Sequence, residues 1–146
     1  MLKKTIFIFL LITFPLQAAT YFVAVNGSDD NTGTESLPFQ TIGKGVSILT
    51  PGDLLYVKEG TYNEYFANNI PNGESWINPV SIIAYPGHTI VIKPTSTGPM
   101  GYVFYFGYYR EAKHVIIDGF VIDGLNSDYG PIKLDDNSHH IKIYQL

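Results

Sequence analysis

Short runs of β-branched residues, separated by turn-forming residues, recur along the second half of this chain. Two of them lie together in residues 114–124 (HVIIDGFVIDG), where each run ends in Asp-Gly. Similar runs occupy residues 54–57, 80–84, 90–92, 132–134 and 141–143. Runs of this length and composition are typical of β-strands, and the Gly, Pro, Asn and Asp residues between them mark the strand ends.

The spacing of these runs indicates a repeat. The interval from Val57 to Ile83 equals the interval from Val115 to Ile141, and the interval from Ile90 to Val115 is only slightly shorter. Such a period is typical of solenoids, and β-branched runs without a second helical stripe exclude helical repeats. The sequence therefore predicts an all-β fold, a parallel β-solenoid whose coils of about 25 residues each contribute two or three strands.

The Asp-Gly pairs suit two kinds of turn. At the corners of a coil, glycine relieves the backbone and the carboxylates of Asp118 and Asp123 can accept bonds from nearby amides. The same pairs also suit two-residue β-hairpins. The recurrence of the flanking runs favours corners.

One short amphipathic helix precedes the strands. Apolar residues recur there at intervals of three and four positions, at Phe39, Ile42, Val46 and Leu49. Ser36 and Pro38 supply start signals, and residues 50–53 (TPGD) end the pattern. A helix in this place can cover the open end of a stack of strands, so we predict that it caps the solenoid.

The first residues have the layout of a secretory signal peptide. Lys3 and Lys4 precede an apolar run over residues 5–16, and small residues follow with cleavage expected after Ala18 or Ala19. We therefore predict a signal peptide over residues 1–19 and the N-terminal part of a parallel β-helix domain over residues 20–146. The predicted location is periplasmic or extracellular, without any membrane contact beyond the signal peptide.

Charge and cysteine content narrow the partners. Removal of Lys3 and Lys4 with the leader leaves seven basic residues against 13 acidic ones, a net charge of −6. Such a surface gains nothing from counterion release, which argues against nucleic acid or an anionic membrane as partner. The chain has no cysteine, which excludes thiol catalysis, zinc–thiolate sites and disulfides.

Several motifs resemble one family. Residues 21–24, 27–29, 38–42, 51–53 and 59–62 resemble the N-terminal cap and first coil of pectate-lyase-like right-handed parallel β-helix proteins, a group that includes DUF1565-like and polysaccharide-lyase-like secreted proteins. Residues 78–87 and 114–124 resemble the coils that follow. The resemblance implies a right-handed β-helix that acts on or binds polysaccharide.

The resemblance also implies a chemistry that the chain does not visibly carry. Lyases of this kind abstract the proton α to a uronate carboxylate with a lysine or arginine base, and calcium offsets the charge. The acidic cluster and the lysine of the middle coils are not recognisable here, so no catalytic residue is assigned. Calcium is possible for the longer family members. The nearest metal candidates are Asp135 and Asp136, with Asp118 and Asp123 one coil earlier, although Asp is also a usual turn former.

An aromatic run over residues 102–109 (YVFYFGYY) supplies the binding candidates. Strand alternation places Tyr102 with Phe104 and Phe106 on one face and Tyr105 on the other. Aromatic rings on the outer face suit stacking against sugar rings, so Tyr105, Tyr108 and Tyr109 are candidates for binding polysaccharide, the expected partner; core packing is the alternative.

Two smaller expectations concern the charged neighbours of this run. Arg110 and Glu111 are expected to neutralise each other at a turn. An extended backbone would point His139 and His140 to opposite faces, so the two would not chelate one ion.

Two kinds of function remain open. The chain ends at Leu146 in a strand without a cap, which predicts a fragment of a longer protein that holds the catalytic coils. On this prediction the chain is a secreted polysaccharide lyase or hydrolase, or its inactive remnant. The alternative is a non-catalytic carbohydrate-binding or adhesin module. The sequence leaves the oligomeric state open.

Overall fold

The computed structural model describes residues 17–144, which fold into short strands with little helix. The strands are β1 (Thr20–Val23), β2 (Leu54–Val57), β3 (Gly60–Tyr62), β4 (Phe66–Ala67), β5 (Val80–Ala84), β6 (Ile90–Ile92), β7 (Tyr102–Phe106), β8 (Ala112–Asp118), β9 (Phe120–Ile122), β10 (Gly130–Leu134) and β11 (Ser138–Tyr144). An α-helix, α1 (Ile42–Val46), follows β1, and a 3-10 turn, η1 (Gly98–Met100), precedes β7.

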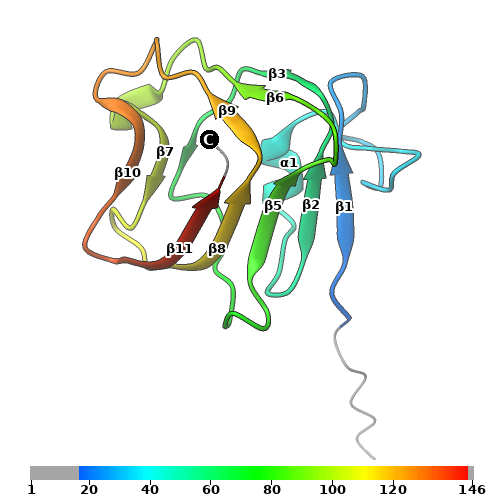
Figure 1. The fold of residues 1–146 in the computed structure, drawn as a ribbon, viewed down its shortest axis with the longest axis horizontal. Helices are drawn as coiled ribbons and strands as arrows, with labels where there is room; N and C mark the ends of the chain where they lie inside the picture. The colour runs from blue at the N-terminus through cyan, green and yellow to red at the C-terminus, as the bar shows by residue number, and fades with distance from the viewer. Residues whose placement is uncertain (1–16, 145–146) are drawn as a thin grey trace, which may run out of the picture.

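These strands form three parallel sheets, with strand orders β1-β2-β5-β8-β11, β10-β7-β4 and β3-β6-β9. Figure 1 shows the strands of the first sheet side by side in chain order. The chain visits the three sheets in turn, through β2, β3 and β4, then β5, β6 and β7, then β8, β9 and β10. Parallel crossovers of this kind are right-handed. The prediction of a right-handed parallel β-helix is confirmed, with about four turns.

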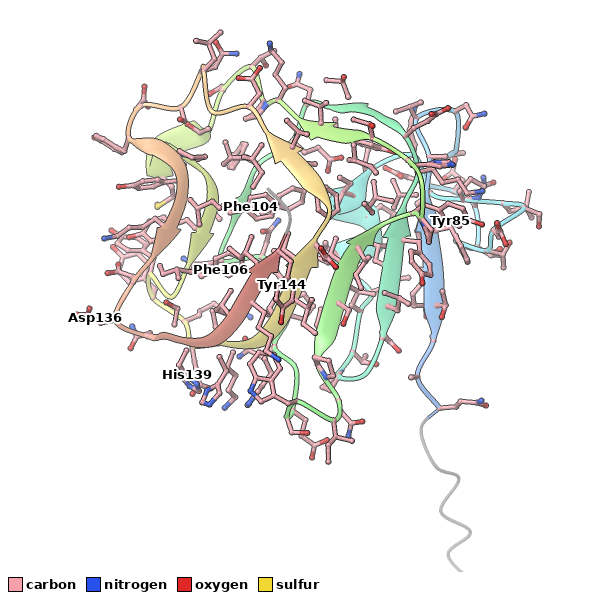
Figure 2. The ribbon with its side chains drawn as sticks, in the orientation of Figure 1. Tyr85, Phe104, Phe106, Asp136, His139 and Tyr144 are labelled. Carbon is pink, nitrogen blue, oxygen red and sulfur yellow. The ribbon has the colours of Figure 1, made fainter. Side chains whose placement is uncertain are left out.

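Side chains from successive coils stack in columns inside the solenoid. In the first sheet Leu55 pairs with Ile82, which pairs with Ile117, and all three are almost fully buried. In the third sheet Ile90 pairs with Phe120, 1% exposed. Figure 2 shows Phe104 and Phe106 of the second sheet in the same interior. Burial of these columns is the main source of stability, because each large apolar side chain contributes about 1.5–3 kcal/mol.

The coils differ in length, which corrects the constant spacing expected from the sequence. Leu54 pairs with Ser81 and Val115 with Ile141, and the coils that these pairs close are of similar length. The coil between them is clearly longer, because Val80 pairs with Val115. The predicted match between Val115 and Ile141 is confirmed. The predicted match between Ile90 and Val115 is wrong, because these residues lie in different sheets.

The Asp118-Gly119 pair forms a corner, as predicted. Gly119 has a φ of 81°, a left-handed conformation that favours glycine, and a Cβ there would lie 2.6 Å from Cβ of Ala84. The strands on its two sides, β8 and β9, belong to different sheets. A hairpin at this position is therefore excluded.

The predicted capping helix is present but shorter than expected. It begins at Ile42, after Thr41, whose hydroxyl accepts a hydrogen bond from the Lys44 amide at 3.1 Å. Its Ile42 and Val46 side chains enter the core next to β1 and β2. Phe39 is not helical and instead forms a bridge with Val23. The helix thus covers the N-terminal end of the core.

The sequence does not predict strands β3 and β4. They are only three and two residues long, so neither contains an apolar run. The predicted signal peptide lies outside the described residues except for 17–19. Within residues 17–144, none of the helices has the length and apolar character that crossing a membrane requires.

Candidate functional site

The outer side of the second sheet and its adjoining loops carry a cluster of tyrosines. We call it the tyrosine surface, and it consists of Tyr65, Tyr102, Tyr105, Tyr108, Tyr109 and Tyr129. These residues come from three coils: from the loop before β4, from β7 and the turn after it, and from the loop before β10. The stacking of coils therefore gathers tyrosines that are far apart in the sequence.

Hydrogen bonds to neighbouring coils fix the turn after β7. Gly107 has a φ of 86°, which turns the chain out of the strand. Its carbonyl accepts a hydrogen bond from the side chain of Asn137 at 3.1 Å, one coil later. One coil earlier, the Asn68 side chain accepts a hydrogen bond from the Tyr108 amide at 3.1 Å. The turn that presents Tyr108 and Tyr109 is thus held from both sides.

The rings contact one another in a continuous series. Ring centroids lie 5.6 Å apart for Tyr129 and Tyr102, 5.3 Å for Tyr102 and Tyr105, and 5.2 Å for Tyr105 and Tyr108. The Tyr109 ring packs at a tilt against the Tyr108 ring, with centroids 3.8 Å apart, and its hydroxyl donates a hydrogen bond to the Tyr108 hydroxyl at 2.6 Å. Contacts of this kind restrict ring rotation, so the surface is largely preformed for a ligand.

The exposed rings border two adjoining hollows. One, of about 450 Å³, is lined by Tyr65, Ala67, Asn68, Asn69, Met100, Tyr108 and Tyr109. The other, of about 270 Å³, is lined by Met100, Tyr102, Tyr105, Tyr108 and Tyr129. Tyr109 is 81% exposed and Tyr129 is 72% exposed. Exposed aromatic faces beside an open trough suit a flat, partly apolar ligand such as a sugar ring.

Tyr105 anchors the surface instead of forming its outermost part. It is only 7% exposed, and its hydroxyl donates a hydrogen bond to Asp135 at 2.8 Å. Burial, followed by this bond to a carboxylate, raises the pKa of Tyr105 to about 12. The pKa of Tyr108 is also raised, mainly through its hydrogen bond with Tyr109. Both phenols stay protonated at neutral pH, so neither serves as a general base.

The acidic candidates for metal binding are dispersed. Asp135 bonds to Tyr105, while Asp123 forms an ion pair with Lys93 at 2.7 Å in another sheet. Asp136 lies exposed at the turn before β11 (Figure 2). Within residues 17–144, no three His, Cys, Asp or Glu side chains gather closely enough to hold a metal ion. Metal binding by Asp135 and Asp136 therefore stays a prediction. Among the described residues, no third acidic or histidine side chain lies close enough to complete such a site.

The sequence located the tyrosine surface only in part. Tyr105, Tyr108 and Tyr109 were candidates, and the structure brings all three together. Tyr102 was expected on the face opposite Tyr105, but the rings of these two residues are in contact. Tyr129 was missed, because only the register of the coils places its loop next to β7. The one sequence feature that could have pointed to Tyr129 is its position directly before the Gly-Pro pair that begins β10.

A larger hollow, of about 660 Å³, lies between the N-terminal loop and the corner after β2. Several of its polar side chains bond to protein partners: Glu35 accepts a hydrogen bond from the Tyr85 hydroxyl at 2.9 Å and lies 3.9 Å from the Lys58 ammonium. His88 accepts a hydrogen bond from the Glu59 amide at 2.9 Å. These contacts tie the loop to the coils, so we assign this hollow a structural role.

A second aromatic cluster lies at the start of β8 and β11, where His114 and His140 stack at 4.8 Å. Both have left-handed φ values, 53° and 57°. The backbone is therefore not extended, and His139 and His140 point toward each other with their Nδ1 atoms in hydrogen-bond contact. The expectation that they face apart is wrong for this reason. Trp76 also contacts His114, with ring centroids 5.3 Å apart.

The charged residues of this cluster pair differently from the expectation. Glu111 forms an ion pair with Lys113 and a hydrogen bond with His139, the latter at 3.1 Å. These contacts lower the pKa of the Glu111 carboxyl, with the Lys113 hydrogen bond as the largest cause. Arg110 instead donates to the Asn68 carbonyl at 3.4 Å. The predicted pair between Arg110 and Glu111 is therefore wrong.

The histidine cluster predicts a loss of stability in acid. Burial, then the neighbouring His140, His139 and Lys113, lower the pKa of His114, while a backbone hydrogen bond at Gly73 opposes the shift. Unfolded His114 then binds a proton more readily than folded His114, so stability falls as the pH drops below the ordinary histidine pKa of about 6.5. We expect His114→Asn, which tolerates the left-handed φ, to flatten the dependence of the unfolding temperature on pH between 7 and 5.

Val121→Ala provides the control, because it changes an exposed side chain of β9 that does not titrate. It should leave the slope of unfolding temperature against pH unchanged. An unchanged slope in His114→Asn would show that the acid sensitivity has another origin.

The fold and this surface together define the class of protein: a parallel β-helix with an aromatic outer face. Residues 25–75 match a family model described as "Protein of unknown function (DUF1565)". The chain is 30% identical over 92 residues to pectate lyase PEL9 of Emericella nidulans, covering 63% of this chain and 22% of that protein. It is 26% identical over 105 residues to the uncharacterized protein YwoF of Bacillus subtilis, covering 72% and 22%.

Two solved structures also match. A rhamnogalacturonan lyase superposes with a TM-score of 0.58 and 25% identity, covering 72% of this chain and 28% of that one. A complex of XylC with xylose matches at a TM-score of 0.47 and 36% identity, covering 49% and 11%. The matches to the pectate lyase and to the rhamnogalacturonan lyase confirm the resemblance to pectate-lyase-like β-helix proteins. The chain spans about a fifth of the length of the curated relatives it matches, and that it is part of a longer protein stays a prediction.

Proposed function

We propose that this protein is an exported β-helix protein that binds polysaccharide through its tyrosine surface. The observation that carries the proposal is the series of contacting tyrosines around two adjoining hollows, with Tyr109 and Tyr129 exposed. Relatives named as a pectate lyase and a rhamnogalacturonan lyase support a pectic polysaccharide as the ligand class. The signal-peptide pattern of residues 1–19 supports export.

The shape of the surface favours a polymer over a single sugar. The two hollows share Met100 and Tyr108, so they form one trough with room for more than one ring. Both hollows are open to solvent, so a chain longer than one ring can extend beyond them. Binding then sums several modest stacking contacts, each worth about 0.5–1.5 kcal/mol.

The charge of the protein favours a ligand with neutral sugars. The mature chain has a net charge of −6, which repels a continuous polyuronate. Stacking on neutral rings needs no counterion. We therefore expect tighter binding to rhamnogalacturonan than to polygalacturonate, and little weakening of rhamnogalacturonan binding when salt rises from about 50 to about 200 mM.

Removal of an exposed ring should weaken binding. We expect Tyr109→Ala and Tyr129→Ala each to lower the affinity for rhamnogalacturonan by about tenfold, equivalent to about 1.4 kcal/mol. Electrophoresis of the native protein through gels containing the polysaccharide measures this affinity. Tyr144→Ala is the matched control, because Tyr144 is 45% exposed but lies on β11 in a different sheet.

Two results would contradict the proposal. Loss of binding in Tyr144→Ala but not in the two surface variants would move the site to the first sheet. Unsaturated product formed from pectate with calcium, detected by its absorbance, would make the chain a lyase and not a binding module.

A further inference from the structure

The backbone just before β1 donates a hydrogen bond to a buried carboxylate, that of Asp53. Asp53, at the start of the second coil, is 4% exposed. Its Oδ1 accepts a hydrogen bond from the Ala19 amide at 2.7 Å. Its Oδ2 accepts hydrogen bonds from the Thr50 amide at 2.8 Å and from the Thr50 hydroxyl at 2.9 Å. Asp53 therefore joins the first described residues to the turn before β2.

All three of these donors are neutral. Among residues 17–144, the ion pairs involve Glu35, Asp123 and Glu111, and none of them reaches Asp53. A buried carboxylate without a counterion is costly, because hydrogen bonds replace only part of its hydration. The hydrogen-bond donor to Asp53 Oδ1 is the backbone nitrogen of Ala19.

We propose that cleavage of the signal peptide between Ala18 and Ala19 turns this nitrogen into an α-ammonium group that forms a buried ion pair with Asp53. Water hydrolyses the peptide bond: its hydroxyl joins the Ala18 carbonyl, and the Ala19 nitrogen takes the hydrogen and one further proton from solvent. The signal peptidase supplies the catalysis. The new positive charge then lies within hydrogen-bond distance of the Asp53 carboxylate, which has no other counterion among the described residues.

The contacts of Ala19 favour cleavage of the peptide bond between Ala18 and Ala19 over cleavage of the bond between Ala19 and Thr20. The sequence allows cleavage after Ala18 or after Ala19, but Ala19 belongs to the fold: its carbonyl also accepts a hydrogen bond from the Leu54 amide at 2.9 Å. Loss of Ala19 would remove a partner from Asp53 and another from Leu54. Gln17 and Ala18 are exposed, whereas Ala19 is half-buried. Cleavage before Ala19 keeps both contacts and strengthens one of them.

This pairing ties maturation to folding. The precursor offers Asp53 one neutral N–H from residue 19, whereas the mature protein offers three N–H groups and a positive charge. The ion pair fixes β1 against β2 at the N-terminal end of the core. Removal of the leader thus adds a charge interaction to a first coil whose strands already pair in the precursor.

The inference rests on the export proposed above, and one preparation tests both. The full chain is expressed in a bacterial host with a general secretory pathway, and the exported product is identified by intact mass and N-terminal sequencing. We expect the product to begin at Ala19. A product that begins at Thr20 would overturn this inference alone, whereas a retained leader would overturn the export as well.

The ion pair itself is tested by the reactivity of the α-amine. A limiting amount of acetic anhydride at neutral pH acetylates free α-amines in preference to lysines. We expect the Ala19 amine of the native mature protein to react about tenfold more slowly than that of Asp53→Asn. Asp136→Asn, which removes an exposed carboxylate, should react like the wild type. Equal rates in the wild type and Asp53→Asn would overturn the proposal.

A second comparison covers the case in which Asp53→Asn does not fold. The wild-type protein is acetylated with and without a concentration of urea that unfolds it. We expect the Ala19 amine to react about tenfold faster in urea, after correction with the lysines as internal references. An Ala19 amine that reacts at the same rate in both conditions would show that it is free in the folded protein.

Discussion

Truncation of Phe120 to alanine should reduce the free energy of unfolding by about 3–5 kcal/mol. Phe120 is 1% exposed and stacks in register on Ile90 of the preceding coil. Removing its ring leaves a cavity that the neighbouring coils cannot close, because their backbones are fixed by the ladders of hydrogen bonds between strands. A domain of this size has about 5–15 kcal/mol of stability, so the loss is a large fraction of the total.

Val121 is the matched control for Phe120. It is the next residue of β9, points to solvent and is 48% exposed. Val121→Ala should change the free energy of unfolding by less than about 0.5 kcal/mol. Urea unfolding followed by the fluorescence of Trp76 measures both variants. A larger effect in Val121→Ala than in Phe120→Ala would contradict the register, since a slip by a single position exchanges the two faces.

The strands were predictable where an apolar run fills the interior. The runs that became β2, β5, β6, β8 and β11 contain Leu, Val and Ile at alternating positions that face the interior. Strands β3 and β4 were not predictable. Only one side chain in each is buried, Tyr62 and Phe66, and so neither strand carries a pattern that distinguishes it from a loop.

Coil length was not predictable from spacing because loops lie outside the core. The interior fixes which side chains stack, but the number of residues between them is free. The long coil from Val80 to Val115 contains the loops before and after β7, and these carry part of the tyrosine surface. The loops therefore account both for the variation in coil length and for part of the candidate site, because the repeat does not constrain them.

The tyrosine surface shows how these unconstrained loops limit the prediction of function from sequence. Tyr108 and Tyr109 were candidates because they adjoin an aromatic strand. Tyr129 joins them only through the register of the coils, since its amide donates a hydrogen bond to the Gly101 carbonyl one coil earlier, at 3.0 Å. For the histidine cluster the obstacle was backbone conformation. Left-handed φ values at His114 and His140 are uncommon for residues other than glycine, and the sequence does not signal them.

The N-terminal cap of the helix depends on an acidic residue of the following coil. The two carboxylate oxygens of Glu64 accept hydrogen bonds from the amides of Ile42 and Gly43, at 2.8 and 2.7 Å. Burial raises the pKa of Glu64, whereas these two bonds act against the shift. Asp29 accepts the amides of Gln40 and Thr41, both at 2.9 Å. Two acidic side chains therefore satisfy the amides at the start of α1.

We expect Glu64→Ala to lower the free energy of unfolding by about 2–3 kcal/mol, because hydrogen bonds to charged groups are worth about 1.5–3 kcal/mol and the two amides lose their partner. Glu64→Gln keeps one acceptor oxygen in place and should lose about half as much. Urea unfolding of the three proteins gives the comparison. Glu59→Ala serves as control, since this exposed side chain lies one strand away, and it should leave stability unchanged. An equal loss in Glu59→Ala and Glu64→Ala would show that general acidic charge, and not the capping of α1, accounts for the effect.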